Sequence, residues 1–252
     1  MLVAERYEKI VQLVNERSSI RVSELSDLCQ VTEETIRRDL DRLEQAGRLR
    51  RSHGGAVSIK DLQPETPYAE REIIHADEKK RIAQEAIKLI NPRDRIVLDA
   101  STTAWYMASN LPDIPLTVLT NSIKVAIELS GKEKIEVIST GGLLASRSLS
   151  YVGPLAERSL DAYYVDKLFL SCKGVHLERG ISESNELQAR IKLKMIGIAD
   201  EVILLADSSK FGVQAFTHVA ELNEVHRIVT DRHLPEQTIS QLTDRSISVT
   251  TV

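Results

Sequence analysis

The chain contains 252 residues and has a formal net charge of −4, from 33 lysines and arginines against 37 acidic side chains. This length accommodates one large domain or two of unequal size. The chain has many aliphatic and few aromatic residues, which is typical of a soluble α/β protein. No apolar run approaches the roughly 20 residues of a membrane span and no signal peptide is evident, so we expect a cytoplasmic protein without a membrane partner. Cys29 and Cys172 lie far apart and the histidines lack metal-ligand spacing, which predicts reduced core thiols, no metal site and no cofactor.

The N-terminal part of the chain begins with the pattern of two short helices. Residues 4–16 show the apolar periodicity of an amphipathic helix, and residues 20–22 form a short extended segment. We expect Ser23 to cap a second helix that buries Leu25 and Leu28, because a serine oxygen can accept a free N–H of the first turn. A tight turn then leads into a third helix.

The third helix has the features of a DNA-recognition helix. Thr32 is a suitable N-cap, and Gly47 is expected to end the helix. Ile36, Leu40 and Leu43 recur at helical spacing and form one buried stripe. The side chains opposite the stripe are Glu34, Arg38 and Arg42, with Thr35 and Arg37 on its flanks. Outward arginines on a packed helix suit a reader of the major groove, although a solvated charged face gives the same pattern.

Positive charge is concentrated in and after this helix, although the net charge is acidic. Residues 37–51 hold six arginines against three acids, and arginine suits bidentate contact with phosphate or guanine. Residues 49–57 predict two short strands around a Gly-Gly turn, so residues 1–58 are expected to form a winged helix-turn-helix domain. A winged helix used only for protein–protein contact is the less favoured alternative.

We expect the third helix to enter the major groove and the wing to contact the DNA backbone. Thr35, Arg37 and Arg38 would meet the bases, while Arg50 and Arg51 would hold phosphates. His53 either touches a phosphate or braces the wing. The candidate DNA-binding residues are Thr32, Thr35, Arg37, Arg38, Arg42, Arg50, Arg51 and His53.

A polar segment with two prolines separates this domain from the rest, and we assign residues 59–74 to a linker. A long helix is predicted from Tyr68 to about Ile90, where Asn91-Pro92 stops it. Apolar strands then alternate with amphipathic helices, which predicts an α/β domain with a mostly parallel sheet over residues 75–252. The predicted strands are residues 95–99, 116–120, 136–139, 167–171, 202–207, 227–231 and 246–249.

Polar clusters follow several of these strands. Ligands of parallel sheets bind beyond the carboxyl ends of the strands, and hydroxyls with free N–H groups at a helix N-terminus suit a phosphate. Each cluster also has a structural explanation, since serines and threonines cap helices, glycines make turns and surface lysines are commonly solvated. The candidate effector-binding residues are Asp99, Ser101, Thr102, Thr103, Asn121, Gly141, Gly142, Lys173, Lys192 and Lys210.

The motif of residues 32–40, followed by Arg51-Ser52-His53-Gly54-Gly55-Ala56, resembles the signature of the DeoR family of bacterial transcription regulators. Arg6 and Ile10 match the same signature. Residues 75–231 resemble the family's effector domain, which is similar to ribose-5-phosphate isomerase. The resemblance implies a repressor of a sugar-catabolism operon that binds double-stranded operator DNA and that a phosphorylated sugar releases.

Within the family, residues 99–108 and 169–174 most resemble regulators of rhamnose catabolism in Gram-positive bacteria, which implies rhamnulose 1-phosphate as effector. Two positions depart from the family pattern. Ser101 stands where glycine is frequent, and Gln188 stands where glutamate is usual in a run that ends at Lys192. An amide cannot shuttle a proton, so Gln188 argues against the alternative function, an isomerase-type enzyme with an appended winged helix.

One small winged helix gives limited affinity for DNA, which predicts a homo-oligomer, either a dimer or a tetramer, that reads repeated or inverted half-sites.

Overall fold

The computed structural model describes residues 3–17, 19–52, 54–57 and 65–252. The chain divides into two compact units, of which the second begins at Glu65, and each is described by itself. Within the described ranges, none of the helices has the length and apolar character that a bilayer span requires.

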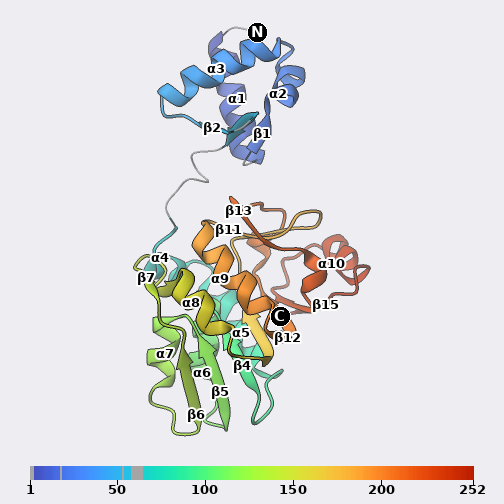
Figure 1. The fold of residues 1–252 in the computed structure, drawn as a ribbon. Helices are drawn as coiled ribbons and strands as arrows, with labels where there is room; N and C mark the ends of the chain where they lie inside the picture. The colour runs from blue at the N-terminus through green and yellow to red at the C-terminus, as the bar shows by residue number, and fades with distance from the viewer. Residues whose placement is uncertain (1–2, 18, 53, 58–64) are drawn as a thin grey trace. The chain divides into compact units, whose positions relative to one another are not determined.

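The first unit is a winged helix (Figure 1). Its elements are α1 (Val3–Arg17), β1 (Ser19–Arg21), α2 (Val22–Cys29), α3 (Glu33–Gln45), β2 (Arg50–Ser52) and β3 (Gly55–Val57). The three strands form an antiparallel sheet in the order β1-β3-β2. Gly55 is required at the centre of this sheet, because a Cβ there would lie 2.2 Å from the Ile20 carbonyl oxygen of β1.

The expected start of the second helix was wrong by two residues, because its N-cap was predicted at Ser23. α2 begins at Val22 directly after β1, with Arg21 at the N-cap and no side-chain cap. The Val22 N–H donates to the Gly54 carbonyl at 2.9 Å, so a backbone carbonyl satisfies the first amide of α2. Leu25 is buried as predicted, while Leu28 is only partly buried.

The expectations for α3 are confirmed in detail. The Thr32 hydroxyl accepts from the Thr35 N–H at 3.3 Å, and Ile36, Leu40 and Leu43 are buried in the core of the unit. Gly47 follows the helix with φ of 65°, the left-handed conformation that glycine adopts at lowest cost.

A buried ion pair fixes α3 against α1. Arg6 donates from Nε to Asp39 Oδ2 at 2.6 Å and from Nη2 to Oδ1 at 3.3 Å. The two side chains are only 11% and 4% exposed, so both charges depend on each other for compensation. The pair therefore fixes the orientation of α3 relative to α1.

The second unit is built on a seven-stranded parallel sheet, as the sequence predicts. In sheet order the strands are β15 (Ser248–Thr251), β14 (Arg227–Thr230), β12 (Ala199–Leu205), β9 (Val165–Leu170), β4 (Arg95–Leu98), β5 (Leu116–Thr120) and β6 (Ile135–Ser139). The helices are α4 (Tyr68–Ile73), α5 (Ala76–Ile87), α6 (Thr102–Asn110), α7 (Ile123–Leu129), α8 (Pro154–Leu160), α9 (Glu186–Ile196) and α10 (Glu236–Thr243).

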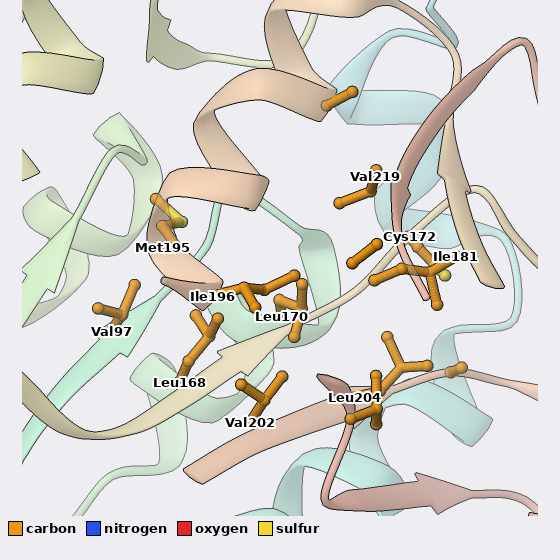
Figure 2. Close-up of a cluster of buried hydrophobic side chains, with 14 of the residues drawn as sticks. Val97, Leu168, Leu170, Cys172, Ile181, Met195, Ile196, Val202, Leu204 and Val219 are labelled. Carbon is orange, nitrogen blue, oxygen red and sulfur yellow. The ribbon is translucent and has the colours of Figure 1, made fainter. Parts of the chain in front are cut away.

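Successive side chains of the central strands enter two different cores, which explains their continuous apolar runs. Phe169 of β9 packs with α5, α6 and α7 on one face. Leu168 and Leu170 point to the other face, where Met195 and Ile196 of α9 cover them (Figure 2). Both faces are thus buried, and α9 is held firmly on one of them.

The prediction of one helix over residues 68–90 was wrong. The chain forms α4 and α5 with a break at Ile74 and His75, and His75 has φ of 52°. Lys79 supports the break, because its ammonium donates to the carbonyls of Arg71 and Ile74 at 2.5 and 2.7 Å. The last strand also begins later than expected, at Ser248.

Two small antiparallel sheets were not predicted. One is the hairpin of β7 (Leu143–Ala145) and β8 (Ser150–Val152), and the other contains β10 (Gly174–His176), β11 (Gly180–Glu183) and β13 (Thr217–Ala220). Each of these five strands has three or four residues, too few to show a clear alternation of apolar and polar side chains.

Replacing Asp39 with alanine should selectively destabilise the first unit. The change leaves the Arg6 guanidinium buried without its carboxylate, which costs about 3 kcal/mol for a pair of this kind. Thermal circular dichroism should show early loss of helix, while the fluorescence of Trp105, the single tryptophan, should report an unchanged transition of the second unit.

Asp41→Ala is the matched control on the same helix, because Asp41 is half-exposed and should cost below about 1 kcal/mol. Equal effects of the two changes would show that burial of the Arg6–Asp39 pair is not important for stability.

Candidate functional site

The exposed face of α3 carries two arginines in ion pairs with glutamates one turn earlier. Arg37 Nη2 lies 2.5 Å from Glu33 Oε2, and Arg38 Nη2 lies 2.6 Å from Glu34 Oε1. Exposed pairs at this spacing contribute only about 0.3–0.5 kcal/mol. Both guanidinium groups can therefore exchange a carboxylate for a phosphate or a base edge at little cost.

Other candidate DNA-binding arginines have partners from different elements. Arg42 donates to the Tyr7 hydroxyl of α1 at 3.2 Å. Arg51 of the wing pairs with Asp41, and its N–H donates to Glu44 at 2.7 Å. His53 and the side chain of Arg50 lie outside what the structure describes.

Sequence reasoning did not select Arg48, although it lies in the same run of arginines. Its guanidinium makes a bidentate pair with Glu8 of α1, with both contacts at 2.8 Å. Thr32 and Thr35 lie together at the start of α3, with their hydroxyl oxygens 2.9 Å apart.

The second unit contains a pocket of about 350 Å³ at the carboxyl ends of β12, β9 and β4. These three strands are neighbours in the sheet, so the loops that follow them converge on one place. The lining residues are Glu65, Thr66, Arg71, Ile74, His75, Lys79, Ser101, Thr102, Ser171, Cys172, Lys173, Glu183, Ser184, Lys192, Asp207, Ser209, Lys210 and Val213.

A buried lysine network forms the floor of this pocket. Lys192 of α9 lies 3.0 Å from Asp99 Oδ2 and 2.7 Å from Glu183 Oε1, and it also donates to the Ser171 carbonyl. Burial disfavours the charged ammonium, but the carboxylates of Asp99 and Glu183 outweigh that effect and raise the pKa of Lys192. Asp99 in turn accepts the N–H groups of Ser101 and Ser171, each at 3.0 Å.

Two further lysines reach the pocket without a carboxylate in salt-bridge range among the described residues. Lys210 donates to the Ser171 hydroxyl at 2.9 Å and to the Cys172 carbonyl at 2.6 Å. Burial, followed by the nearby charge of Lys210, lowers the pKa of Lys79 to about 8. These lysines are suited to receive an anionic ligand.

The structure brings five of the ten candidate effector-binding residues into the pocket lining: Ser101, Thr102, Lys173, Lys192 and Lys210. Asp99 lies directly behind them and holds Lys192. Ser101 is also the N-cap of α6, since its hydroxyl accepts the Ala104 N–H at 3.0 Å. Its side chain therefore has a structural function at the position where the family often has glycine.

Thr103, Asn121, Gly141 and Gly142 do not line this pocket. The β7–β8 hairpin occupies the end of β5 instead: Asn121 Nδ2 donates to the Tyr151 carbonyl at 3.0 Å, and the Asn121 carbonyl accepts the Tyr151 N–H at 2.7 Å. Gly142 is needed for packing, because a Cβ there would lie 2.9 Å from Ala156 Cβ of α8.

Gln188 does not point into the pocket either. Its amide nitrogen donates to the hydroxyls of Ser148 and Ser150 at 2.8 and 2.9 Å, so it ties α9 to the β7–β8 hairpin. In this chain the Gln188 amide, at the position where the family usually has glutamate, therefore serves the contact with the hairpin.

Sequence reasoning missed several charged or titratable lining residues, among them Glu65, Arg71, His75, Lys79 and Glu183. The first four belong to the segment that was assigned to a linker and a continuous helix, and Glu183 belongs to a short strand that was not predicted. Cys172 was correctly predicted as a buried free thiol, and burial raises its pKa to about 12, so it stays protonated.

A winged helix with arginines on its third helix, followed by a domain with a lysine-rich pocket, defines a DNA-binding transcription regulator with a sensor domain. Residues 6–61 match the DeoR-like helix-turn-helix domain, and residues 74–232 match the DeoR C-terminal sensor domain. The chain belongs to the DeoR family of transcription regulators.

Three relatives illustrate the similarity. An uncharacterized HTH-type transcriptional regulator of Bacillus subtilis, YulB, is 60% identical over 252 residues, which cover 100% of this chain and 98% of that protein. The L-fucose operon activator of Haemophilus influenzae is 40% identical over 92% of this chain and 93% of its own length. The repressor GlcR of B. subtilis is 38% identical over 98% and 95%.

Among solved structures, the chain is similar to ribose 5-phosphate isomerase A of Methanocaldococcus jannaschii, with a TM-score of 0.41 and 20% identity over 54% of this chain and 55% of that chain. The relatives are named as transcription regulators, so this protein is a regulator and the alternative reading as an isomerase-type enzyme is set aside.

Replacing Lys192 with methionine should strongly destabilise the second unit. The change leaves Asp99 and Glu183 buried together without a cation, and removal of one partner from a buried ionic cluster costs about 3–5 kcal/mol. Urea denaturation followed by Trp105 fluorescence measures the effect. Lys173→Met is the control, since Lys173 is an exposed lining residue, and it should change the midpoint little.

Proposed function

We propose that this regulator is a homo-oligomeric repressor of a sugar-catabolism operon and that a phosphorylated sugar releases it from its operator. The observation that carries the proposal is the composition of the pocket. Its lining contains five lysines and arginines against three aspartates and glutamates, together with serine and threonine hydroxyls. Cations suit a phosphate dianion, and hydroxyls with carboxylates suit the hydroxyl groups of a sugar.

The first candidate for the effector is rhamnulose 1-phosphate. Support comes from the resemblance of residues 99–108 and 169–174 to regulators of rhamnose catabolism, and these segments provide Ser101, Thr102, Ser171 and Lys173 to the lining. Two of the relatives are named for opposite effects on transcription: one is an activator of an L-fucose operon and the other is a repressor. We favour repression with release by the effector.

On the DNA side, we propose that Thr32, Thr35, Arg37 and Arg38 face the major groove. Arg42, Arg50, Arg51 and His53 would contact the sugar-phosphate backbone. Residues 1–58 would be the DNA-binding domain and residues 75–252 the domain for sensing and oligomerisation. The predicted linker of residues 59–74 is shortened at its end, because residues 65–74 belong to the second unit. Oligomerisation would supply the affinity that one small winged helix lacks.

The decisive experiment is a screen of phosphorylated sugars, including rhamnulose 1-phosphate, for displacement of the full chain from the DNA upstream of its own gene. Release by one phosphorylated sugar, and not by the same sugar without phosphate, is the expected result. Displacement by none of them, together with no binding in calorimetry, would contradict the proposed effector. Sedimentation at micromolar concentration tests the oligomer, and a monomer with full operator affinity would contradict it.

Two arginine changes should separate base reading from backbone contact. Arg38→Ala should reduce the preference for operator over random DNA by about 1–3 kcal/mol, because a bidentate base contact is lost. Arg51→Ala should weaken binding to both DNAs alike and lower the salt slope by about one. Gel-shift titrations at several salt concentrations measure both quantities, and the same pattern from the two variants would contradict the assignment.

Affinity for a phosphorylated sugar should fall as the pH rises through about 8. In the ligand-free protein Lys79 loses its proton near that pH, whereas a bound phosphate favours the charged ammonium, so binding takes up a proton above pH 8. The phosphate itself stays a dianion from pH 7 to 9, since its second pKa is about 6. Lys79→Arg stays charged and should show a flat calorimetric profile, and a profile that matches the unsubstituted protein would rule Lys79 out.

A further inference from the structure

The segment that enters the second unit forms one wall of the pocket. Residues 65–74, which we call the strap, contribute Glu65, Thr66, Arg71 and Ile74 to the lining. The strap is also the part of the second unit that follows directly, along the chain, from the connection to the winged helix. A ligand in the pocket therefore touches the polypeptide that leads to the DNA-binding domain.

Arg71 is the central side chain of the strap. Its Nε donates to the Thr66 carbonyl at 3.0 Å, so the guanidinium plane is fixed. Its Nη2 is buried and has no hydrogen-bond acceptor among the described residues, and the nearest carboxylate, Glu65 Oε1, lies 3.8 Å away. A buried guanidinium N–H without an acceptor is costly, and an anion in the pocket can supply one.

Glu65 links Arg71 to other elements. Its second carboxylate oxygen accepts from Asn185 Nδ2 at 3.4 Å, and its carbonyl accepts from Arg147 Nη1 at 3.3 Å. The Tyr68 N–H donates to the Arg147 carbonyl at 2.7 Å. The start of the strap is thus held between the cap of α9 and the β7–β8 turn, and Glu65 and Arg71 both line the pocket.

We propose that the phosphate group of the effector binds Arg71 in place of Glu65, and that this exchange is the step by which the pocket acts on the connection to the DNA-binding domain. A phosphate oxygen takes the free Nη2 hydrogen bond and withdraws the guanidinium from the carboxylate. Glu65 then loses its cation, and the ties of the strap rearrange. The inference rests on the proposed function, because it requires that the pocket binds a phosphorylated sugar.

Lys79 and Lys210 make this end of the pocket a suitable place for the phosphate. Lys79 holds the carbonyls of Arg71 and Ile74 at the end of α4, and it lines the same pocket. Thr102 Oγ1 donates to the Arg71 carbonyl at 3.5 Å, so the first residue of α6 contacts the strap as well. By contrast, Lys192 is already compensated by Asp99 and Glu183.

The test uses the full chain with inorganic phosphate and rhamnulose 1-phosphate as probes. Calorimetry measures the affinity for each probe, and fluorescence anisotropy measures affinity for the upstream DNA with and without rhamnulose 1-phosphate. Arg71→Gln should weaken binding of both probes by about tenfold or more, the loss expected for one hydrogen bond to a charged group. Arg81→Gln, which removes a half-exposed arginine of α5 outside the pocket, should change neither measurement.

Glu65→Gln gives the readout that a merely structural role would not produce. Without its carboxylate competitor, Arg71 should bind inorganic phosphate more tightly. The DNA affinity of the ligand-free variant should shift in the direction that rhamnulose 1-phosphate shifts the unsubstituted protein, and the response to the probe should shrink.

The outcomes separate the two proposals. Failure of the unsubstituted protein to bind either probe would overturn the proposed function and this inference with it. Normal binding by the unsubstituted protein, with equal affinity in Arg71→Gln, would overturn the inference alone. A Glu65→Gln variant with an unchanged DNA response would likewise remove the exchange as the coupling step.

Discussion

The buried ammonium of Lys192 is the interaction on which the second unit's site depends. It joins the end of β4 through Asp99, the end of β9 through the Ser171 carbonyl, and β11 through Glu183. Lys192 belongs to α9, and the apolar side chains Met195 and Ile196 of the same helix cover one face of the sheet (Figure 2). Because the two carboxylates already compensate Lys192, the charge that remains for a ligand comes from Arg71, Lys79, Lys173 and Lys210.

The sequence predicted the architecture well where a strong periodic signal existed. The alternation of apolar strands and helices identified all seven strands of the parallel sheet, and the stripe of Ile36, Leu40 and Leu43 identified the third helix. The same reasoning failed at His75, because a left-handed residue supported by the side chain of Lys79 is a tertiary effect that no local pattern displays.

The site was predicted only in part for a related reason. The rule that ligands lie beyond the strand ends placed Ser101, Thr102 and Lys210 correctly in one pocket, but it cannot tell which strand ends remain open. Here the β7–β8 hairpin occupies the end of β5, so Asn121 has a backbone partner. Conversely, the strap was assigned to a linker, although it supplies Arg71 to the lining.

The balance of charges in the winged helix bears on how strongly it would bind DNA. Residues 1–56 contain ten basic and ten acidic side chains, and Arg37, Arg38 and Arg51 are each paired with an acid. A phosphate of random DNA offers each guanidinium little more than the carboxylate it already has, whereas a base edge adds a directional contact. Under the proposed function, operator binding depends on a few base contacts, and a coupling free energy of about 1–3 kcal/mol from the pocket would change it about 5- to 150-fold. A nearly neutral DNA-binding domain would therefore suit control by the proposed effector.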